Sequence, residues 1–186
     1  MKKIAVILLA LLALMGCELF KVREAEPPTK PPLWNNFVTT WSACLQNLQY
    51  CYGDARNVVK YSSLFTPSFR FNFAAQDIND YGINLIWGRT QEQDMLFSLH
   101  DQCDSLSLQL TEIPNQSDEI TPSDATIYRS YILKAYKKKQ PTPEVYEGNL
   151  ELRFKKDLGN WYIDLWNDYR SGSQPTWGKL KYDNSQ

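Results

Sequence analysis

Few side chains in this sequence are suited to acid–base chemistry, and two of them are aspartates near its end. Asp164 and Asp168 fall in the run 160–169, where polar residues alternate with three hydrophobic ones: Trp161, Ile163 and Leu165. This alternation predicts a strand with one buried face, and both aspartates lie on the other face with Tyr162 and Trp166. A general base must reach its substrate inside a pocket, so we expect no catalysis by these aspartates. A β-bulge near Trp166 would reverse their orientation.

His100 is the only histidine of the sequence. It precedes Cys103 by three residues in a predicted helix, a spacing at which an imidazole and a thiol could act as base and nucleophile. We expect instead that His100 lies at the surface or between elements. The Cys, His and acidic residues do not follow the spacing of a metal site, and we predict neither a metal nor another cofactor.

A third candidate is Arg129, in the β-rich run 125–136. Alternation places it on one face with Tyr131, Ile127 and Leu133. A buried guanidinium would need an acidic partner or an anionic ligand. The alternative, which we expect, is that Arg129 lies at the exposed end of its strand.

The N-terminus points to covalent chemistry. Two lysines precede the apolar run Ile4–Leu14, which is shorter than the about 20 residues of a membrane span. We therefore predict a signal peptide over residues 1–16. The motif LMGC resembles the lipobox of bacterial lipoproteins, which implies cleavage before Cys17 and its acylation, a stable membrane anchor. The alternative is a plain signal peptide with an incidental cysteine. The resemblance implies a cell-envelope location, at the outer membrane if the host is Gram-negative, because Glu18 and not Asp follows the cysteine.

Composition divides the rest of the chain. Residues 17–32 hold the cysteine and a charged, Pro-rich tether. Residues 33–170 suit one domain, and 171–186 form a polar C-terminal tail in which Trp177 and Leu180 could dock. The formal net charge of −1 argues against a nucleic-acid partner. The lysines within 134–140 are expected at a solvated strand end.

Three cysteines remain once Cys17 is set aside. Cys44 and Cys51 lie seven residues apart on one predicted helix, a rise of roughly 10 Å that is too long for a disulfide. A disulfide would therefore join Cys103 to either Cys44 or Cys51. Three buried thiols are the equally acceptable alternative.

Three helices are predicted. Asp54 is the expected N-cap of a helix to residue 64, and Thr90 the N-cap of one over 89–103. A longer helix is predicted within 33–53, where hydrophobic residues recur at helical spacing: Phe37, Trp41, Cys44, Leu48 and Cys51.

Strands are predicted where hydrophobic residues alternate strictly, at 68–73, 105–113, 125–136, 145–156 and 160–170. A short turn with Gly159 makes the last two a hairpin. Sequential strands at the end of a chain imply an antiparallel sheet, with the helices covering its apolar face.

The order of elements and three stretches resemble the nuclear transport factor 2-like superfamily, which has a cystatin-like α+β fold. The stretches are YSSLFTPSFRFNF, WGRTQEQDMLFSL and YEGNLELRFKKDLGNWYIDLWNDY, and the last carries the family's cadence on Gly148, Leu150, Leu152, Trp161, Ile163, Trp166 and Asp168. The resemblance implies a curved antiparallel sheet wrapped around a long N-terminal helix, with two further helices and a cone-shaped pocket. It does not imply an activity, because this fold carries isomerases, dehydratases, hydrolases and pure binding modules.

Under this resemblance Trp41, Trp87, Arg129 and Tyr131 would line the pocket. Our main hypothesis is a membrane-anchored, non-enzymatic envelope lipoprotein that binds a small apolar ligand or a protein partner. The pocket or a sheet face would do the binding, and the partner would be another envelope protein or a second copy in a homodimer. An aromatic patch with Tyr162 and Trp166 would favour the sheet face. The alternative is a pocket-type isomerase, dehydratase or hydrolase, which would need a desolvated carboxylate facing Tyr131 or Arg129.

Overall fold

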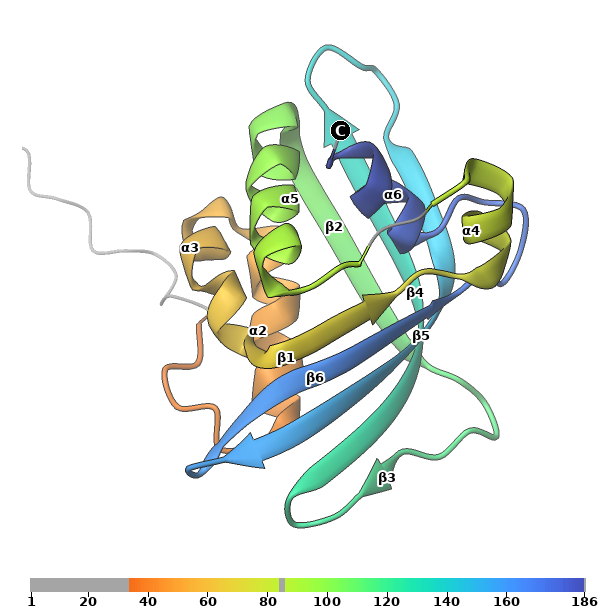
Figure 1. Ribbon diagram of the computed structural model, residues 1–186. Coiled ribbons are helices and arrows are strands. Elements are labelled where there is room, and N and C mark those ends of the chain that lie inside the picture. Colours follow the sequence, from red (N-terminus) through yellow and green to blue (C-terminus); the bar gives the residue numbers. More distant parts are fainter. Residues whose placement is uncertain (1–33, 84–85, 186) are drawn as a thin grey trace, which may run out of the picture. The chain divides into compact units, whose positions relative to one another are not determined.

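The computed structural model describes residues 34–83 and 86–185 (Figure 1). The chain divides into the units Met1–Pro32 and Leu33–Gln186, and the fold below is that of the second unit. The predicted signal peptide, the acylated Cys17 and the tether lie outside the described residues. No helix among the described residues is both long and apolar enough to cross a membrane.

Helices and strands follow the predicted order, with additions. The α-helices are α2 (Trp41–Gly53), α3 (Val58–Tyr61), α4 (Ala75–Tyr81), α5 (Arg89–Gln102) and α6 (Trp177–Asp183). The strands are β1 (Phe65–Asn72), β2 (Cys103–Glu112), β3 (Glu119–Ile120), β4 (Asp124–Lys137), β5 (Glu144–Asp157) and β6 (Asn160–Tyr169). The sequence did not predict α4, β3 or α6.

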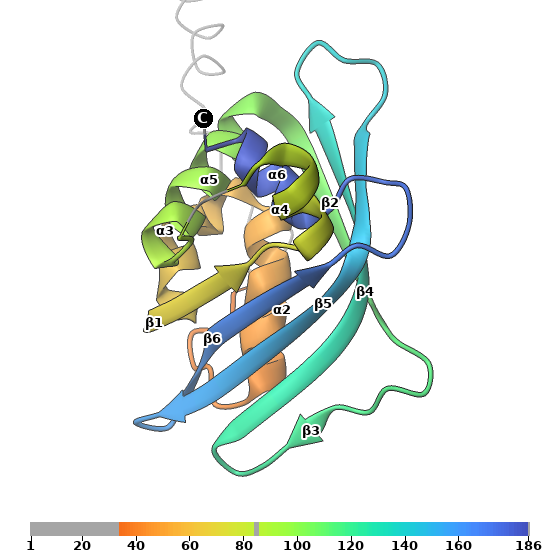
Figure 2. The same ribbon diagram turned by 45° about the vertical axis from the view of Figure 1, so that its right-hand side comes forward.

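The sheet has the order β1-β6-β5-β4-β2, with β3 paired to β4. Neighbours from β2 to β6 are antiparallel, as predicted for sequential strands. Only β1 differs among the described strands, because it pairs with β6 in parallel. A long stretch of chain separates β1 from β6, so no hairpin forces them to be antiparallel. Figures 1 and 2 show the sheet curling around α2, with α4, α5 and α6 grouped at one end. The predicted α+β class with a strongly curved sheet is confirmed.

Capping residues set where the helices begin. The first helix starts at Trp41 and not near residue 33, because the hydroxyl of Thr40 accepts a hydrogen bond from Ala43 N at 3.1 Å. Phe37 is consequently outside the helix and 81% exposed. Asp54 caps the following turn as predicted, accepting from Arg56 N at 3.0 Å.

The cap of α5 differs from the prediction. Its N-cap is Gly88 and not Thr90. The side chain of Gln91 accepts from Gly88 N at 3.1 Å, so the side chain that closes the first turn lies three residues after the true cap.

A β-bulge in β6 corrects the predicted orientation of Asp168. Arg153 of β5 pairs with Leu165 and the next residue, Phe154, pairs with Ile163, so Asp164 has no partner of its own. Beyond the bulge the faces exchange. Asp168 and Trp166 therefore point into the core, where they are 2% and 0% exposed, and Leu165 turns away from it. The sequence placed a bulge here only as the less favoured alternative.

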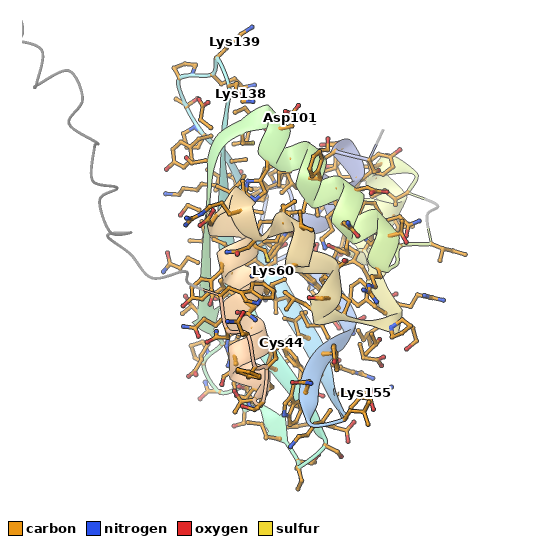
Figure 3. The ribbon with its side chains drawn as sticks, turned by 90° about the vertical axis from the view of Figure 1, so that its left-hand side faces the viewer. Cys44, Lys60, Asp101, Lys138, Lys139 and Lys155 are labelled. Atoms are coloured by element: carbon orange, nitrogen blue, oxygen red, sulfur yellow. The ribbon has the colours of Figure 1, made fainter. Side chains whose placement is uncertain are left out.

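The C-terminal residues do not form a polar tail. Residues 177–183 form α6, and Trp177 and Leu180 are fully buried, which confirms that these two side chains dock. Thr176 caps the helix, its hydroxyl accepting from Lys179 N at 3.1 Å. The lysines of the β4–β5 loop behave as predicted: Lys138 and Lys139 are exposed at the tip of this hairpin (Figure 3).

The cysteines of the described chain, Cys44, Cys51 and Cys103, are free and buried. The sequence left open both a disulfide from Cys103 to Cys44 or Cys51 and three buried thiols, and the structure has the three buried thiols. The two thiols on α2 donate to main-chain carbonyls, those of Leu64 at 3.9 Å and Asn57 at 3.5 Å (Cys44 is labelled in Figure 3). Burial raises the pKa of all three thiols, which disfavours the reactive thiolate.

Candidate functional site

We call the cone the part of the core between the concave face of the sheet and helices α2 and α5, around Tyr52, Tyr131, Trp166 and Asp168. The indole of Trp177, the first residue of α6, lies in it. It packs edge-on against three rings, with centroid distances of 4.5 Å to Trp166, 4.8 Å to Tyr52 and 5.2 Å to Tyr131. Its Nε1 donates to the Tyr52 hydroxyl at 2.9 Å. The centre of the cone is therefore filled by the chain itself.

Asp168 binds the beginning of α6. Its Oδ2 accepts from the main-chain N of Gly178 at 2.7 Å, and its Oδ1 accepts from the Tyr131 hydroxyl at 2.8 Å. The Tyr131 oxygen in turn accepts from Trp177 N at 2.8 Å. Burial raises the pKa of Asp168 to about 6, and these hydrogen bonds to the carboxylate limit the rise.

Lys181 of α6 is fully buried in the same space. Its ammonium pairs with Glu92 of α5, and it lies 3.8 Å and 4.1 Å from the ring centroids of Trp166 and Phe71. Glu92 also accepts from Trp87 Nε1 and the Tyr61 hydroxyl, both at 2.9 Å. Burial lowers the pKa of Lys181 to about 8 against the opposing effect of Glu92. Both charges are thus paired and hydrogen-bonded, as buried charges must be.

A third cluster holds the residues just before α6. Asp77 of α4, itself fully buried, accepts from the Thr176 hydroxyl and pairs with Arg170. Arg170 also donates to Asp80 at 2.7 Å. The chain between β6 and α6 is therefore fixed to α4 by ion pairs at Arg170 and by a hydrogen bond at Thr176.

The raised pKa of Asp168 gives a pH prediction. The folded pKa of about 6 lies above the ordinary value of 3.8. The stability that this group contributes is therefore fully present only below the ordinary value and is lost as the pH rises through 6. We expect the difference in unfolding free energy between the wild type and Asp168→Asn to fall by about 2 kcal/mol from pH 4 to pH 7. Urea unfolding of both proteins across this range measures it. A difference that stays constant with pH would contradict the buried, titrating carboxyl.

The four residues predicted to line one pocket do not share a site. Tyr131 and Trp87 lie at the cone, where Tyr131 donates a hydrogen bond to Asp168 and Trp87 donates one to Glu92. Trp41 is half-buried and packs on Phe154, with ring centroids 6.3 Å apart. Five surface hollows of the described residues, of about 270 to 540 Å³, are lined by residues other than Trp41, Trp87 and Tyr131.

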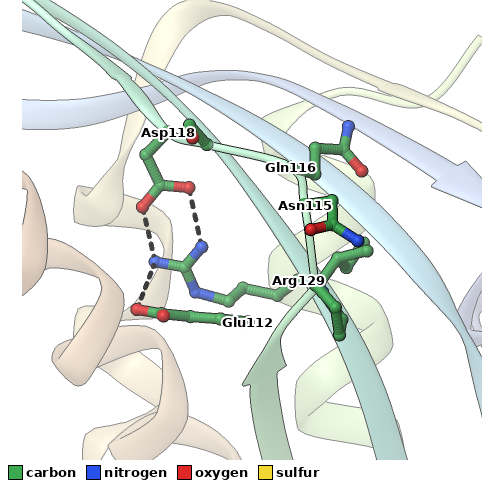
Figure 4. A pocket seen from close by; sticks show the side chains of 8 residues that line it. Glu112, Asn115, Gln116, Asp118 and Arg129 are labelled. Atoms are coloured by element: carbon green, nitrogen blue, oxygen red, sulfur yellow. Dashed lines mark hydrogen bonds and ion pairs between the residues drawn. The ribbon is translucent and has the colours of Figure 1, made fainter.

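Arg129 is buried and not at an exposed strand end, contrary to our expectation. It is 7% exposed, and its guanidinium donates two hydrogen bonds of 2.7 Å to Asp118. Glu112 lies 3.9 Å away on its other side (Figure 4). A polar hollow of about 540 Å³ lies between this cluster and residues 113–117. Because the charge of Arg129 is already neutralised by Asp118, the hollow is a poor site for an anion.

His100 does not activate Cys103. Its Nε2 lies 2.7 Å from the carbonyl oxygen of Cys51, which supports the predicted position between elements. Cys103 begins β2 and does not continue α5, so the expected helical spacing of the two side chains is lost. The described residues contain no cluster of Cys, His and acidic side chains that could hold a metal.

Sequence reasoning missed Glu92, Asp77 and Lys181. All three are charged residues in polar stretches, and such residues are mostly exposed. One signal was present for Lys181: it follows Trp177 by four residues and therefore lies on the same helical face. For Asp168 the signal was the family-like residue pattern of the closing hairpin, because Asp168 is the last residue of that pattern.

Comparison with known proteins identifies the fold and no more. No family model and no curated protein matches the sequence significantly. A candidate aromatic ring hydroxylase of Novosphingobium aromaticivorans matches with a TM-score of 0.58 at 10% identity, over 78% of this chain and 94% of that one. A candidate scytalone dehydratase of the same organism matches with 0.56 at 14% identity, over 74% and 91%. The β subunit of a candidate aromatic-ring-hydroxylating dioxygenase, also from this organism, matches with 0.53 at 12% identity, over 76% and 94%. At these identities the likeness shows that the chain has the α+β fold with a strongly curled sheet, as its sequence predicted.

Proposed function

We propose that this chain is a lipid-anchored, non-catalytic protein of the bacterial cell envelope that binds a protein partner. The observation that carries the proposal is the filling of the cone by α6. Asp168, Glu92 and Tyr131 are the polar groups that a ligand would use, and each is bonded to α6. A small apolar ligand would have to displace Trp177 before it could bind.

The outer face of the sheet supports a protein partner. Tyr128, Glu151, Arg153 and Tyr169 lie together there, at a shallow hollow of about 270 Å³ beside Tyr128 and Tyr169. Glu151 accepts from Arg153 Nε at 2.7 Å and from the Tyr169 hydroxyl at 3.1 Å. Tyrosine and arginine are enriched in protein interfaces. Trp166, which we expected in this patch, is buried in the cone instead.

Native mass spectrometry of the chain extracted from host membranes in mild detergent tests this proposal. We expect the mass of the acylated chain, alone or with a protein partner or second copy, and no stoichiometric small molecule. A small organic molecule bound one to one would contradict it. A Tyr169→Ala, Arg153→Ala variant should lose a protein partner bound at the outer face, because these side chains form the proposed surface.

The anchor has its own prediction. Metabolic labelling with a fatty-acid analogue should mark the wild type and leave Cys17→Ser unlabelled, because only an acylated cysteine carries the lipid. The matched control is Cys103→Ser, which removes a buried thiol and should keep the label. Equal labelling of the wild type and Cys17→Ser would refute the anchor.

One observation favours the enzymatic alternative as a second candidate. Asp168 is a desolvated carboxyl with a raised pKa facing Tyr131, which is the arrangement a general base of this kind needs. In the structure, however, both carboxylate oxygens already accept hydrogen bonds. Turnover of an isomerase, dehydratase or esterase substrate panel that is lost in Asp168→Asn would support this candidate, and no turnover would exclude it for those substrates.

A further inference from the structure

Helix α6 is held in place almost entirely by side chains. A single main-chain hydrogen bond, from Glu147 N to Pro175 O at 3.0 Å, joins residues 171–185 to the main chain of the other described residues. The helix has seven residues, and isolated helices below about 12 residues are unstable in water. The segment therefore becomes helical by docking, as a bound peptide does.

The cone recognises this segment at three points. Tyr52, Tyr131 and Trp166 form a slot for the indole of Trp177. Asp168 accepts the main-chain N–H of Gly178. The third point, for an ammonium, combines a carboxylate with two aromatic faces: Glu92, Trp166 and Phe71.

The contact between Asp168 and residue 178 also restricts the size of the side chain at residue 178. A Cβ on residue 178 would lie 2.9 Å from Asp168 Oδ2, closer than such atoms approach one another, and 3.0 Å from Phe73 Cδ1, a tight contact. A side chain at this position would force Asp168 or Phe73 to shift, so glycine is favoured after the tryptophan. The cone therefore binds a segment in which glycine directly follows a tryptophan and lysine lies four residues after that tryptophan.

We propose that the cone is a binding site for a short helical peptide with this pattern, and that the α6 segment of a second copy of this chain occupies it when the chain's own α6 is released. The inference goes beyond the proposed function, because the cone lies on the other face of the sheet from the surface proposed there for a protein partner. The chain's own helix has the advantage of being tethered through residues 170–176, which gives it a high effective concentration. A copy in trans competes when the cis helix is weakened or displaced.

The test uses the full chain with Trp177→Ala as the receptor and a fluorescent peptide of residues 171–186 as the probe. We expect the peptide to bind this variant at least about tenfold more tightly than the wild type, whose own helix competes. Binding should raise the variant's thermal midpoint. Two control peptides, carrying Trp177→Ala or Gly178→Ala, should bind at least about tenfold more weakly than the native peptide.

A matched control separates the cone from general loosening of the core. Phe154→Ala removes a buried ring outside the cone cluster and keeps α6 intact, so this variant should bind the peptide no better than the wild type does. If Trp177→Ala is unfolded, the peptide must restore its folded far-UV circular dichroism. A second receptor, Lys181→Ala, repeats the measurement with a milder change.

Absence of peptide binding to either receptor, or equal binding of the control peptides, would overturn the inference. Such a failure leaves the fatty-acid labelling of Cys17 and the small-molecule result unchanged, so it is distinguishable from failure of the proposed function.

Discussion

Replacing Trp177 with alanine should lower the free energy of unfolding by about 3–5 kcal/mol, the range for deleting a large buried aromatic side chain. The indole is fully buried, contacts three rings and donates to Tyr52. Its removal leaves a cavity at the centre of the cone, and the Tyr52 hydroxyl keeps only its hydrogen bond with the Tyr61 hydroxyl, at 3.5 Å. Urea unfolding followed by circular dichroism measures the loss.

The matched control for this variant is Phe37→Ala, which truncates an aromatic residue that is 81% exposed. Its effect should stay within about 0.5 kcal/mol. If Trp177→Ala costs as little as Phe37→Ala, then the docking of α6 does not contribute to the stability of the domain.

Replacing Glu92 with leucine should be equally damaging, at about 3–5 kcal/mol, because the change leaves the buried ammonium of Lys181 without its partner. The Tyr61 hydroxyl and Trp87 Nε1 lose their acceptor as well. Lys181→Met should cost less, since Glu92 then keeps two donors. Urea unfolding of the single and double variants measures these effects.

The double variant Glu92→Leu, Lys181→Met should recover most of the loss, because an apolar pair can replace a buried ion pair at little cost. The control is the partly exposed pair of Lys179 and Asp183, where Asp183→Leu should cost at most about 1 kcal/mol. A double variant no more stable than Glu92→Leu alone would show that the ammonium is not the source of the loss.

The sequence was a good guide to elements that follow a regular period. Alternation located the strands because one face of the sheet is buried along most of its length. It failed where a single residue changes the period: the bulge at Asp164 turns Asp168 from the outer to the inner face, and no local signal fixes such a bulge. Helical spacing likewise extended the first helix to Phe37, although the hydroxyl of Thr40 ends it on the N-terminal side.

The contents of the cone were beyond local patterns. The C-terminal stretch is polar apart from Trp177 and Leu180, so it was predicted as a tail. Its burial depends on partners distant in the sequence, chiefly Glu92 for Lys181 and Asp168 for Gly178. None of these four residues is hydrophobic, so no hydrophobic pattern marks them as buried.

Amide hydrogen exchange at Trp177 and Gly178, measured by NMR, tests the filling of the cone most directly. The first amides of a helix have no acceptor within it, so their protection can come only from docking. The structure gives both an acceptor, Tyr131 for Trp177 and Asp168 for Gly178. We expect both to exchange slowly, while the amide of the exposed Ser173 exchanges rapidly. Rapid exchange at all three positions would contradict a cone filled by α6.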